Sequence, residues 1–286
     1  MSGRSEFGVL YVVATPIGNL ADMTARAIDC LKTVDIIACE DTRTSAKLLS
    51  YFNISTKTWA YHDHNADTQT AQLLDRLKAG QSIALISDAG TPLVSDPGYR
   101  LVKACHEANV SVSPIVGASA AIGALSVAGL PSDKFYFYGF LPVKSTARKA
   151  ELYALKRMTA TLIFYEAPHR ILDCLADMAQ TFGADRRVTF CRELTKTFET
   201  VRLTTLGELC EFVKADSNQQ KGEIVIVVAG DTEKTDEDLS VHDPLLTALM
   251  AELPIKKAAA LASTLTGVKK NTLYDRLLIL KEKTDT

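Results

Sequence analysis

The sequence predicts an α/β protein with two α/β domains and a small helical appendage at the C-terminal end. In the first half, short apolar runs of strand length alternate with amphipathic helix-like segments, a pattern typical of a largely parallel sheet. In the second half the last strand-like runs follow one another closely, which favours antiparallel pairing. After an acid-rich stretch, the remaining segments are helix-like. The 286 residues are enough for two domains.

The composition is that of a soluble globular protein, with 47% hydrophobic and 23% charged residues and a formal net charge of −2. No apolar run reaches the roughly 18 residues that span a bilayer, so no membrane partner is expected. The first residues, MSGRSEFG, lack an apolar signal-peptide core. Six scattered cysteines without a CxxC pair predict free thiols and a cytoplasmic protein. Because the net charge is slightly negative, any nucleic-acid binding must use a local basic surface.

The first domain is predicted over residues 8–141. Its opening run, Val9 to Ala14, is continuously apolar, as expected for a buried central strand. Asp22 is a suitable cap for the first helix, and Gly80 is a suitable stop for the third. Strands are expected over 9–14, 35–39, 58–61, 82–86, 110–116 and 135–140, and helices over 22–32, 47–52, 68–79, 99–109 and 117–128.

The second domain is predicted over residues 142–230, and it opens with a basic segment. Five basic residues between Lys144 and Arg157 face one acid, Glu151, so this segment is either a solvated helix face or a contact for a polyanion. Strands are expected over 161–165, 188–191, 199–203 and 224–228, with helices ending at Phe182 and spanning 206–214.

Residues 231–243 are predicted to be a solvated acidic linker, because they contain six acids and one lysine. Residues 244–286 form the predicted helical appendage, in which Gly267 separates the second helix from the third. Seven basic residues and two acids lie between Pro254 and Lys283. A helix-turn-helix-like unit, a helical cap on the second domain and a dimer contact all agree with this pattern.

The most distinctive stretch is Ile86 to Gly98, ISDAGTPLVSDPG, which follows a strand-like run and precedes a helix-like segment. Gly90 removes a Cβ where the chain turns or a ligand comes close, and Pro92 and Pro97 stiffen the loop. In an α/β sheet, a small-residue turn between strand and helix is where the backbone meets a ligand. The loop is longer and more polar than a simple connection requires.

Other polar or small-residue loops also follow predicted strands, and ligands gather at the carboxyl ends of parallel strands. One cleft lined by all of these loops is therefore expected. The sequence has no GxGxxG, GxxxxGK[ST] or GxSxG pattern, which disfavours a dinucleotide fold, a P-loop and an α/β-hydrolase. The loops are Thr15-Pro16, Glu40-Asp41, Asp88–Asp96, Gly117–Ala120, Glu166–Arg170 and Arg192–Lys196.

The run His62-Asp63-His64-Asn65 could be read as part of a metal site. No third group of ligands of metal-site type lies nearby in the sequence, however. A polar loop that faces a ligand is the favoured interpretation, and no metal is expected.

Several motifs together resemble the bacterial small-subunit rRNA cytidine 2′-O-methyltransferase family, within the tetrapyrrole-methylase-like superfamily of S-adenosylmethionine enzymes. Each motif is weak alone, but they are ordered and span the chain nearly up to the linker. One departure is Val116, where the superfamily usually has proline before the glycine. The motifs are VATPIGNL (13–20), CEDTRTSAKLL (39–49), SDAGTPLVSDPG (87–98), GASAAIGALSVAGLPSDKF (117–135), GFLPVK (139–144), FYEAPHR (164–170), RELTKTFE (192–199), KGEIVIVV (221–228) and, in the tail, GVKKNTLYDRLL (267–278).

The resemblance implies that S-adenosylmethionine binds folded between two α/β domains, that the enzyme is a homodimer and that no metal takes part. It also implies transfer of the donor's methyl group to a ribose 2′-hydroxyl of small-subunit ribosomal RNA, with an assembled subunit as the expected partner.

The resemblance also implies which residues contact the donor. Carried onto this sequence, the donor contacts are Pro16, Asp88, Ala89, Gly90, Thr91, Val94, Ser119, Ala120, Tyr165, Glu166, Ala167, Leu194 and Gly222.

A base should remove the hydroxyl proton as the new bond forms, but the sequence does not identify it. The cleft candidates are Glu40, Asp41, Glu166, His169, Glu193 and Lys196, of which we select Glu166, Lys196 and Glu40 as predicted catalytic residues. The residues predicted to contact RNA phosphates are Arg43, Lys144, Arg148, Arg170 and Arg192. For each of these charged residues a structural ion pair is the alternative.

Two other functions stay open. One is methylation of a tetrapyrrole on the same fold, and the salt sensitivity of substrate binding would distinguish it from RNA methylation. The other is a non-catalytic RNA-binding or assembly factor that retains a donor pocket. That function would gain support if the protein, given labelled donor, left the relevant RNA unmodified.

Overall fold

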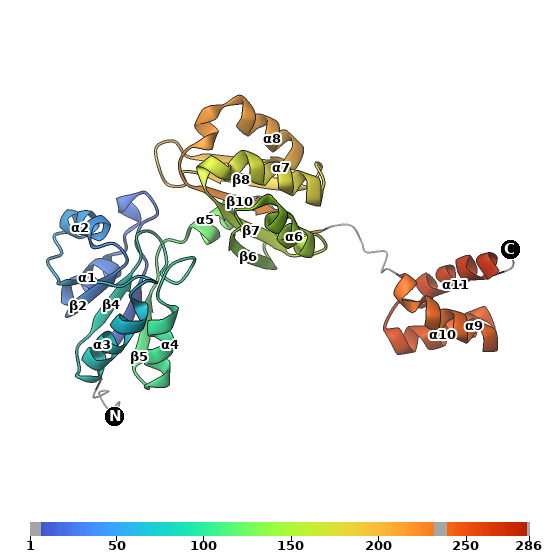
Figure 1. Cartoon of the computed structure of the whole chain (residues 1–286), viewed down its shortest axis with the longest axis horizontal. Coiled ribbons are helices and arrows are strands. Elements are labelled where there is room, and N and C mark those ends of the chain that lie inside the picture. The colour runs from blue at the N-terminus through green and yellow to red at the C-terminus, as the bar shows by residue number, and fades with distance from the viewer. Residues whose placement is uncertain (1–6, 232–238, 285–286) are drawn as a thin grey trace. The chain divides into compact units, whose positions relative to one another are not determined.

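The computed structural model describes residues 7–231 and 239–284. The chain divides into two compact units, one up to Gly230 and the other from Asp231 onward. The first unit contains two five-stranded sheets, and the second is helical (Figure 1). This architecture confirms the predicted α/β class with a helical appendage.

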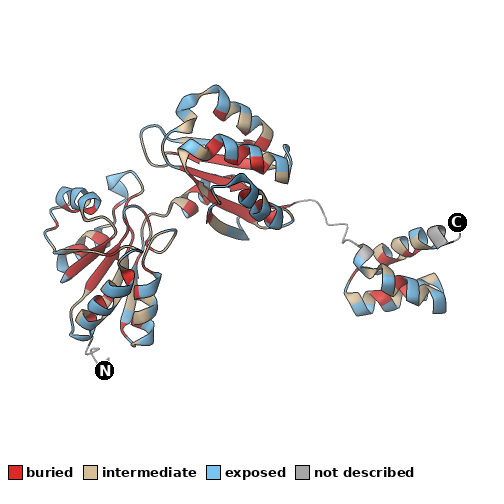
Figure 2. Ribbon diagram, in the orientation of Figure 1, coloured by how far each residue is buried: buried red, intermediate tan, exposed pale blue. Residues whose placement is uncertain are grey.

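The first sheet is parallel, with strand order β3-β2-β4-β1-β5. Helices cover both faces, so every residue of β2 and β4 is buried (Figure 2). Ile36 and Ala38 point into the core under α3 and α4, whereas Ile37 and Cys39 point into the core under α1. The elements are β1 (Val9–Val13), α1 (Ala25–Thr33), β2 (Ile36–Cys39), α2 (Thr42–Tyr51), β3 (Thr58–Ala60), α3 (Ala66–Lys78), β4 (Ile83–Ile86), α4 (Tyr99–Glu107) and β5 (Ser111–Ile115).

The starts of helices α1 and α2 differ from the prediction. Asp22 ends a short 3-10 helix, η1 (Leu20–Asp22), and Thr24 caps α1 instead, because its side chain accepts a hydrogen bond from the Ala27 amide. Helix α2 begins at Thr42, five residues earlier than predicted, with Asp41 as its cap. Its first turn is polar and therefore gives no apolar periodicity to read.

The second sheet has the order β6-β7-β10-β8-β9. β10 is antiparallel to β7 and β8, and β8 is antiparallel to β9, which confirms the predicted antiparallel character. Helices α6, α7 and α8 cover one face, and α5 packs on the other. The elements are α5 (Ala120–Val127), β6 (Phe135–Phe140), α6 (Ser145–Leu155), β7 (Thr161–Glu166), η2 (Pro168–Arg170), α7 (Ile171–Phe182), β8 (Arg187–Arg192), β9 (Thr200–Thr205), α8 (Leu206–Ala215), η3 (Ser217–Gln220) and β10 (Ile224–Val228).

The predicted domain boundary at 141/142 needs correction. Strand β6 pairs in parallel with β7, so it belongs to the second sheet rather than to the first domain. Helix α5 packs against Ile163 and Val225 of the same sheet. The chain therefore changes sheets between β5 and α5. Length and apolar pattern place a strand at 135–140 but do not specify the strand with which it pairs.

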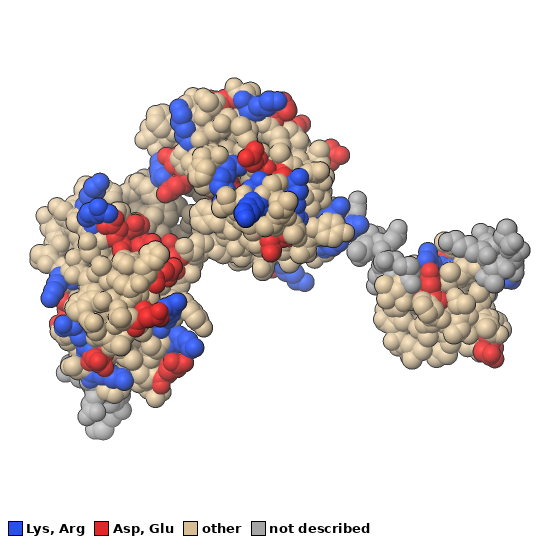
Figure 3. Space-filling view, viewed as in Figure 1, with Lys and Arg blue, Asp and Glu red and all other residues tan. Residues whose placement is uncertain are grey.

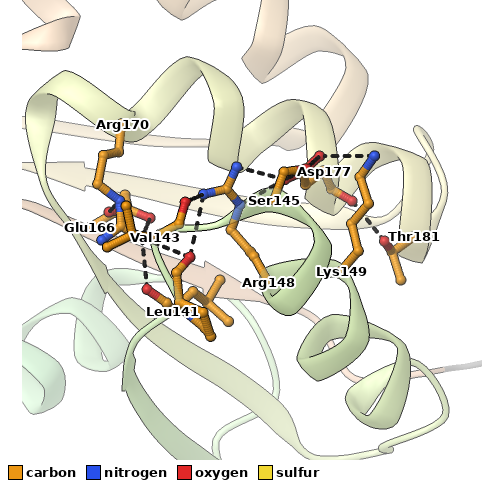
Figure 4. A network of polar contacts seen from close by, with 10 residues as sticks. Leu141, Val143, Ser145, Arg148, Lys149, Glu166, Arg170, Asp177 and Thr181 are labelled. Atoms are coloured by element: carbon orange, nitrogen blue, oxygen red, sulfur yellow. Dashed lines mark hydrogen bonds and ion pairs between the residues drawn. The ribbon is translucent and has the colours of Figure 1, made fainter.

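The basic segment at the start of α6 contains a buried ion pair (Figure 4). Arg148 is 3% exposed, and its guanidinium lies 2.6 Å from an Asp177 carboxylate oxygen on α7. Ser145 and Lys149 also contact that carboxylate. Burial by itself would raise the pKa of Asp177, but these polar partners outweigh burial and hold the pKa below its ordinary value.

Replacing Asp177 with asparagine should lower the free energy of unfolding by about 3–5 kcal/mol, because it leaves the Arg148 charge buried without a counterion. Urea unfolding at pH 7 measures the loss. The exposed Asp173→Asn on the same helix is the control and should change stability by about 0.5 kcal/mol or less. Because the folded pKa is depressed, the contribution is complete above the unfolded value, near 3.9, and is lost as the pH falls through the folded value. A loss at pH 7 no larger than that of the control would contradict this account.

The second unit contains η4 (Leu239–His242), α9 (Asp243–Glu252), α10 (Ile255–Thr266) and α11 (Lys270–Thr284). Gly267, with a φ of 77°, ends α10 in the left-handed conformation and allows α11 to turn back. Leu246, Ala258 and Leu273 contribute to the core. Of the predicted linker, residues 232–238 lie outside the described residues, and residues 239–243 belong to η4 and the first turn of α9.

Candidate functional site

A cavity of about 390 Å³ lies between the two sheets of the first unit. Loops that follow β1, β4 and β5 line it from one side, and β6, β7 and the start of β10 line it from the other. Its volume is that of a small-molecule site. The lining residues are Ile17, Asp88, Ala89, Gly90, Thr91, Val94, Ser95, Asp96, Ser119, Ala120, Phe140, Tyr165, Glu166, Ala167, Pro168, Gly222, Glu223, Ile224 and Val225.

The loop after β4 is tied to its neighbours by hydrogen bonds. The Thr15 amide donates to the Gly90 carbonyl at 2.8 Å, and the Gly90 amide donates to the Thr15 carbonyl at 3.1 Å. The Thr91 hydroxyl donates to the Ala118 carbonyl at 2.9 Å, which joins this loop to the one after β5. Gly90 itself has a φ of 81°. The three loops therefore form one connected wall of the cavity.

Unusual backbone conformations are concentrated beside this cavity. Leu93 and Ser95 have φ values of 73° and 67°, and Glu193 and Thr195 have φ values of 51° and 66°. Non-glycine residues rarely adopt positive φ, and such residues collect at ligand sites where the surrounding structure holds them. The two loops are thus held in shapes that their sequences alone would not favour.

The second sheet contributes an aromatic wall. The Tyr165 hydroxyl accepts a hydrogen bond of 3.1 Å from the Ala121 amide at the start of α5. Phe140 packs against the Tyr165 ring, with ring centroids 5.6 Å apart. Burial raises the pKa of Tyr165, so the phenol is neutral at physiological pH. This wall offers apolar surface and a fixed neutral hydroxyl.

The cavity lining is acidic on both sides. Asp88, Asp96 and Glu223 all line the cavity. Burial raises the pKa of Asp96, and the nearby Asp88 raises it further. Burial also raises the pKa of Glu40, as do Asp88 and Asp96. Such a site favours a cationic ligand, which would relieve the repulsion among these carboxyl groups.

Lys196, in the β8–β9 loop, pairs with two carboxylates. Its ammonium group lies 2.8 Å from a Glu193 carboxylate oxygen and 2.8 Å from a Glu223 carboxylate oxygen. Partial burial disfavours the charged lysine, but the two hydrogen bonds outweigh burial and raise the pKa of Lys196 above its ordinary value. Lys196 is therefore a cation at neutral pH and cannot serve as the base.

Most of the predicted donor contacts meet at this cavity. Pro16 and Leu194 are the exceptions. Pro16 lines an adjoining pocket, and Leu194 packs against the apolar cluster under α5. Sequence reasoning missed residues that lie within or beside the same motifs, where the motif pattern does not show which side chains face inward. They are Ile17, Ser95, Asp96, Phe140, Pro168, Glu223, Ile224 and Val225.

None of the three predicted catalytic residues is placed to act as the base. The Glu166 side chain is fully buried, accepts a hydrogen bond of 2.8 Å from the Ala167 amide and pairs with Arg170 at 3.1 Å (Figure 4). Glu40 lines neither the cavity nor the adjoining pocket. Together with the protonated Lys196, these positions leave no suitable base among the three.

Three of the five arginines and lysines predicted to contact RNA phosphates instead pair with carboxylates or carbonyl groups of the protein itself, which corrects the prediction. Arg148 is buried against Asp177, and Arg192 is 7% exposed and donates to the Phe198 carbonyl at 2.8 Å. Arg170 holds Glu166 and the Leu141 carbonyl. Arg43 has a 90% exposed side chain, but its guanidinium lies 3.0 Å from an Asp41 carboxylate oxygen, and only the exposed Lys144 of the five remains open to a phosphate.

The loop 62–65 lines neither cavity. Asn65 holds it by accepting from the His62 amide at 2.9 Å and donating to the Ala60 carbonyl at 3.1 Å. Across residues 7–231 and 239–284, no group of three His, Cys, Asp or Glu side chains could hold a metal ion. No helix in these same ranges is long and apolar enough to cross a membrane.

Comparison with known proteins identifies the family. Residues 9–210 match the tetrapyrrole (corrin/porphyrin) methylase family, and residues 236–281 match the RsmI C-terminal HTH domain. A ribosomal RNA small subunit methyltransferase I from Vibrio cholerae is 53% identical over 271 residues, covering 93% of each chain. The protein of the same name from Escherichia coli O157:H7 is also 53% identical and covers 96% of each chain.

The chain belongs to the ribosomal RNA small subunit methyltransferase I family. It is therefore a methyltransferase, and the second family match favours the helix-turn-helix-like unit among the three alternatives for the tail. Solved structures of other proteins are similar to this chain in fold alone. A uroporphyrin-III C-methyltransferase from Thermus thermophilus is 19% identical with a TM-score of 0.54, covering 78% of this chain and 94% of its own. A diphthine synthase is 15% identical with a TM-score of 0.57, covering 77% and 89%.

Proposed function

We propose that this member of the ribosomal RNA small subunit methyltransferase I family transfers a methyl group from S-adenosylmethionine to the 2′-hydroxyl of a cytidine in small-subunit ribosomal RNA. The observation that carries the proposal is the near full-length 53% identity to relatives of that name. The convergence of the motif loops on one cavity supports it. The alternative of a tetrapyrrole substrate has support only at the level of fold.

The cavity suits the donor. Gly90, Ala89 and Ala120 allow a ligand to approach the backbone closely, and a side chain at Gly222 would occupy the space of the Glu193 carboxyl group, 2.4 Å from its Cβ position. The carboxylates of Asp88, Asp96 and Glu223 complement a positively charged ligand. S-adenosylmethionine supplies an electrophilic methyl group on a sulfonium centre. The protein then has to align the acceptor oxygen with that methyl group and receive a proton.

Asp88 is the residue we propose for receiving the proton. Asp88 and Glu223 are the two carboxylates that line both the donor cavity and the pocket beside it. Glu223 is engaged by Lys196, whereas the Asp88 carboxylate accepts a single weak hydrogen bond of 3.3 Å from the Asp41 amide. A carboxylate at the junction can reach a hydroxyl that approaches the donor. Asp88 thus replaces the three catalytic residues predicted from the sequence.

We further propose a homodimer. Helix α5 exposes Ile122 and Val127, and edge strand β9 exposes Val201 and Leu203. Contiguous exposed apolar side chains mark interaction surfaces. Sedimentation at several protein concentrations would test this, and a monomer at all of them would reject it.

The function is tested with labelled donor and either naked ribosomal RNA or assembled small subunits, followed by nuclease digestion and mass spectrometry. We expect 2′-O-methylcytidine at one position, formed with the assembled subunit. A methyl group on a base would overturn the ribose assignment. No transfer to either RNA, with donor binding intact, would favour the non-catalytic binding factor.

A further inference from the structure

A second pocket of about 350 Å³ adjoins the donor cavity. We propose that it receives the target nucleotide, inserted with its ribose toward the donor and its phosphate held by Lys47. This inference rests on the proposed function, because it assigns the acceptor of the same reaction. The lining residues are Pro16, Ile17, Gly18, Leu20, Thr44, Lys47, Leu48, Asp88, Ala89, Lys196 and Glu223.

The position of this pocket is the first argument. Ile17, Asp88, Ala89 and Glu223 line both the pocket and the donor cavity, so the two spaces share a wall. Methyl transfer requires the acceptor oxygen and the methyl carbon to come within about 3–3.5 Å. A ligand in the second pocket would approach the donor across the Asp88 carboxylate, which would then face the incoming hydroxyl.

The charge of the pocket is the second argument. The visible face of the first unit shows basic and acidic side chains interspersed, without one continuous basic surface (Figure 3). Lys47 nevertheless lines the second pocket, whereas the other lysine of the lining, Lys196, is paired with Glu193 and Glu223. Arg43 lies one turn before Lys47 on α2, but its guanidinium pairs with Asp41 at 3.0 Å, so the phosphate contact is assigned to Lys47. A lysine beside a cavity suits a phosphate of a single strand.

The shape and lining of the pocket are the third argument. Pro16, Leu20 and Leu48 give it apolar surface against which a base or ribose can pack. Lys196 forms another part of the lining, and its stem lies so close to Gly18 that a Cβ there would come within 2.4 Å of the lysine Cγ. An unstacked nucleotide, with its apolar faces and one charged phosphate, matches this combination.

The first test fills the pocket with a bulky side chain introduced on α2. Thr44 and Ala46 are both exposed on this helix, but only Thr44 lines the pocket. Thr44→Trp should lower the single-turnover rate of transfer to small subunits by about 100-fold or more, because the acceptor is displaced from the donor. Donor affinity, measured by calorimetry, should stay at the wild-type value. Ala46→Trp should leave both quantities unchanged.

A second variant tests the phosphate contact. Lys47→Gln should weaken binding to small-subunit RNA and reduce the slope of log affinity against log salt by about 0.7–0.9. Lys78→Gln, an exposed lysine on α3, should change neither quantity. Wild-type transfer by Thr44→Trp or a wild-type salt slope for Lys47→Gln would overturn the acceptor pocket while leaving the proposed function intact. If the wild-type protein itself methylates no ribosomal RNA, both proposals fall.

Discussion

Replacing Gly90 with valine should reduce the affinity for S-adenosylmethionine by about 100-fold or more while the protein stays folded. Gly90 has a φ of 81°, a conformation that a β-branched residue adopts only with strain, and its Cβ would lie 3.3 Å from the Ile17 side chain. A valine in this conformation would carry about 1–3 kcal/mol of backbone strain, and the backbone must move to relieve it. The mutual hydrogen bonds between Gly90 and Thr15 would then break, and the wall that contains Asp88 and Thr91 would shift.

Isothermal titration calorimetry with the donor measures this loss, and circular dichroism checks the fold. Gly183→Val is the matched control. Gly183 has a φ of 99° at the end of α7, with nothing within 4 Å of its Cβ position, and it does not line the cavity. The control should therefore lose stability but bind the donor normally. If Gly90→Val binds the donor as well as the control does, the donor lies elsewhere.

Replacing Asp88 with asparagine should lower the rate of methyl transfer by about 10²- to 10⁴-fold, the usual contribution of a positioned acid or base. The substitution keeps the shape of the side chain and an oxygen for the Asp41 amide, but it removes the group that takes the hydroxyl proton. Single-turnover rates at saturating donor and small subunits isolate this step. Donor affinity should fall by much less than the rate, because the rest of the lining is unchanged.

Glu40→Gln is the informative comparison, because Glu40 was predicted from the sequence to be catalytic and lies outside both pockets. It should keep a rate within a few-fold of wild type. An inactive Glu40→Gln beside an active Asp88→Asn would reverse the assignment. Equal losses of rate and donor affinity in Asp88→Asn would make Asp88 a donor ligand and not the base.

The local pattern of apolar and polar residues was sufficient to predict most of the helices and strands. The continuous apolar runs that form β2 and β4 are buried on both faces, and the sequence shows this directly. The start of α2 was missed because Thr42 to Ser45 are polar and mask the helical period. The pairing of β6 was missed for a different reason. Its six residues would suit the edge of either sheet, and the packing of α5 on the second sheet decides between them.

The sequence by itself determined the order of strands and helices, the family and the loops that line the cavity, because each depends on residues close together in the chain. Only the tertiary structure decided which charged side chains are available for chemistry. Arg148 is neutralised by Asp177, 29 residues away, and Lys196 by Glu223, 27 residues away. Burial and pairing set the free energy of a charge, and both arise from neighbours that the fold brings together. Asp88 lies at the junction of the two pockets, whereas Glu166 is paired with Arg170 and Arg148 with Asp177.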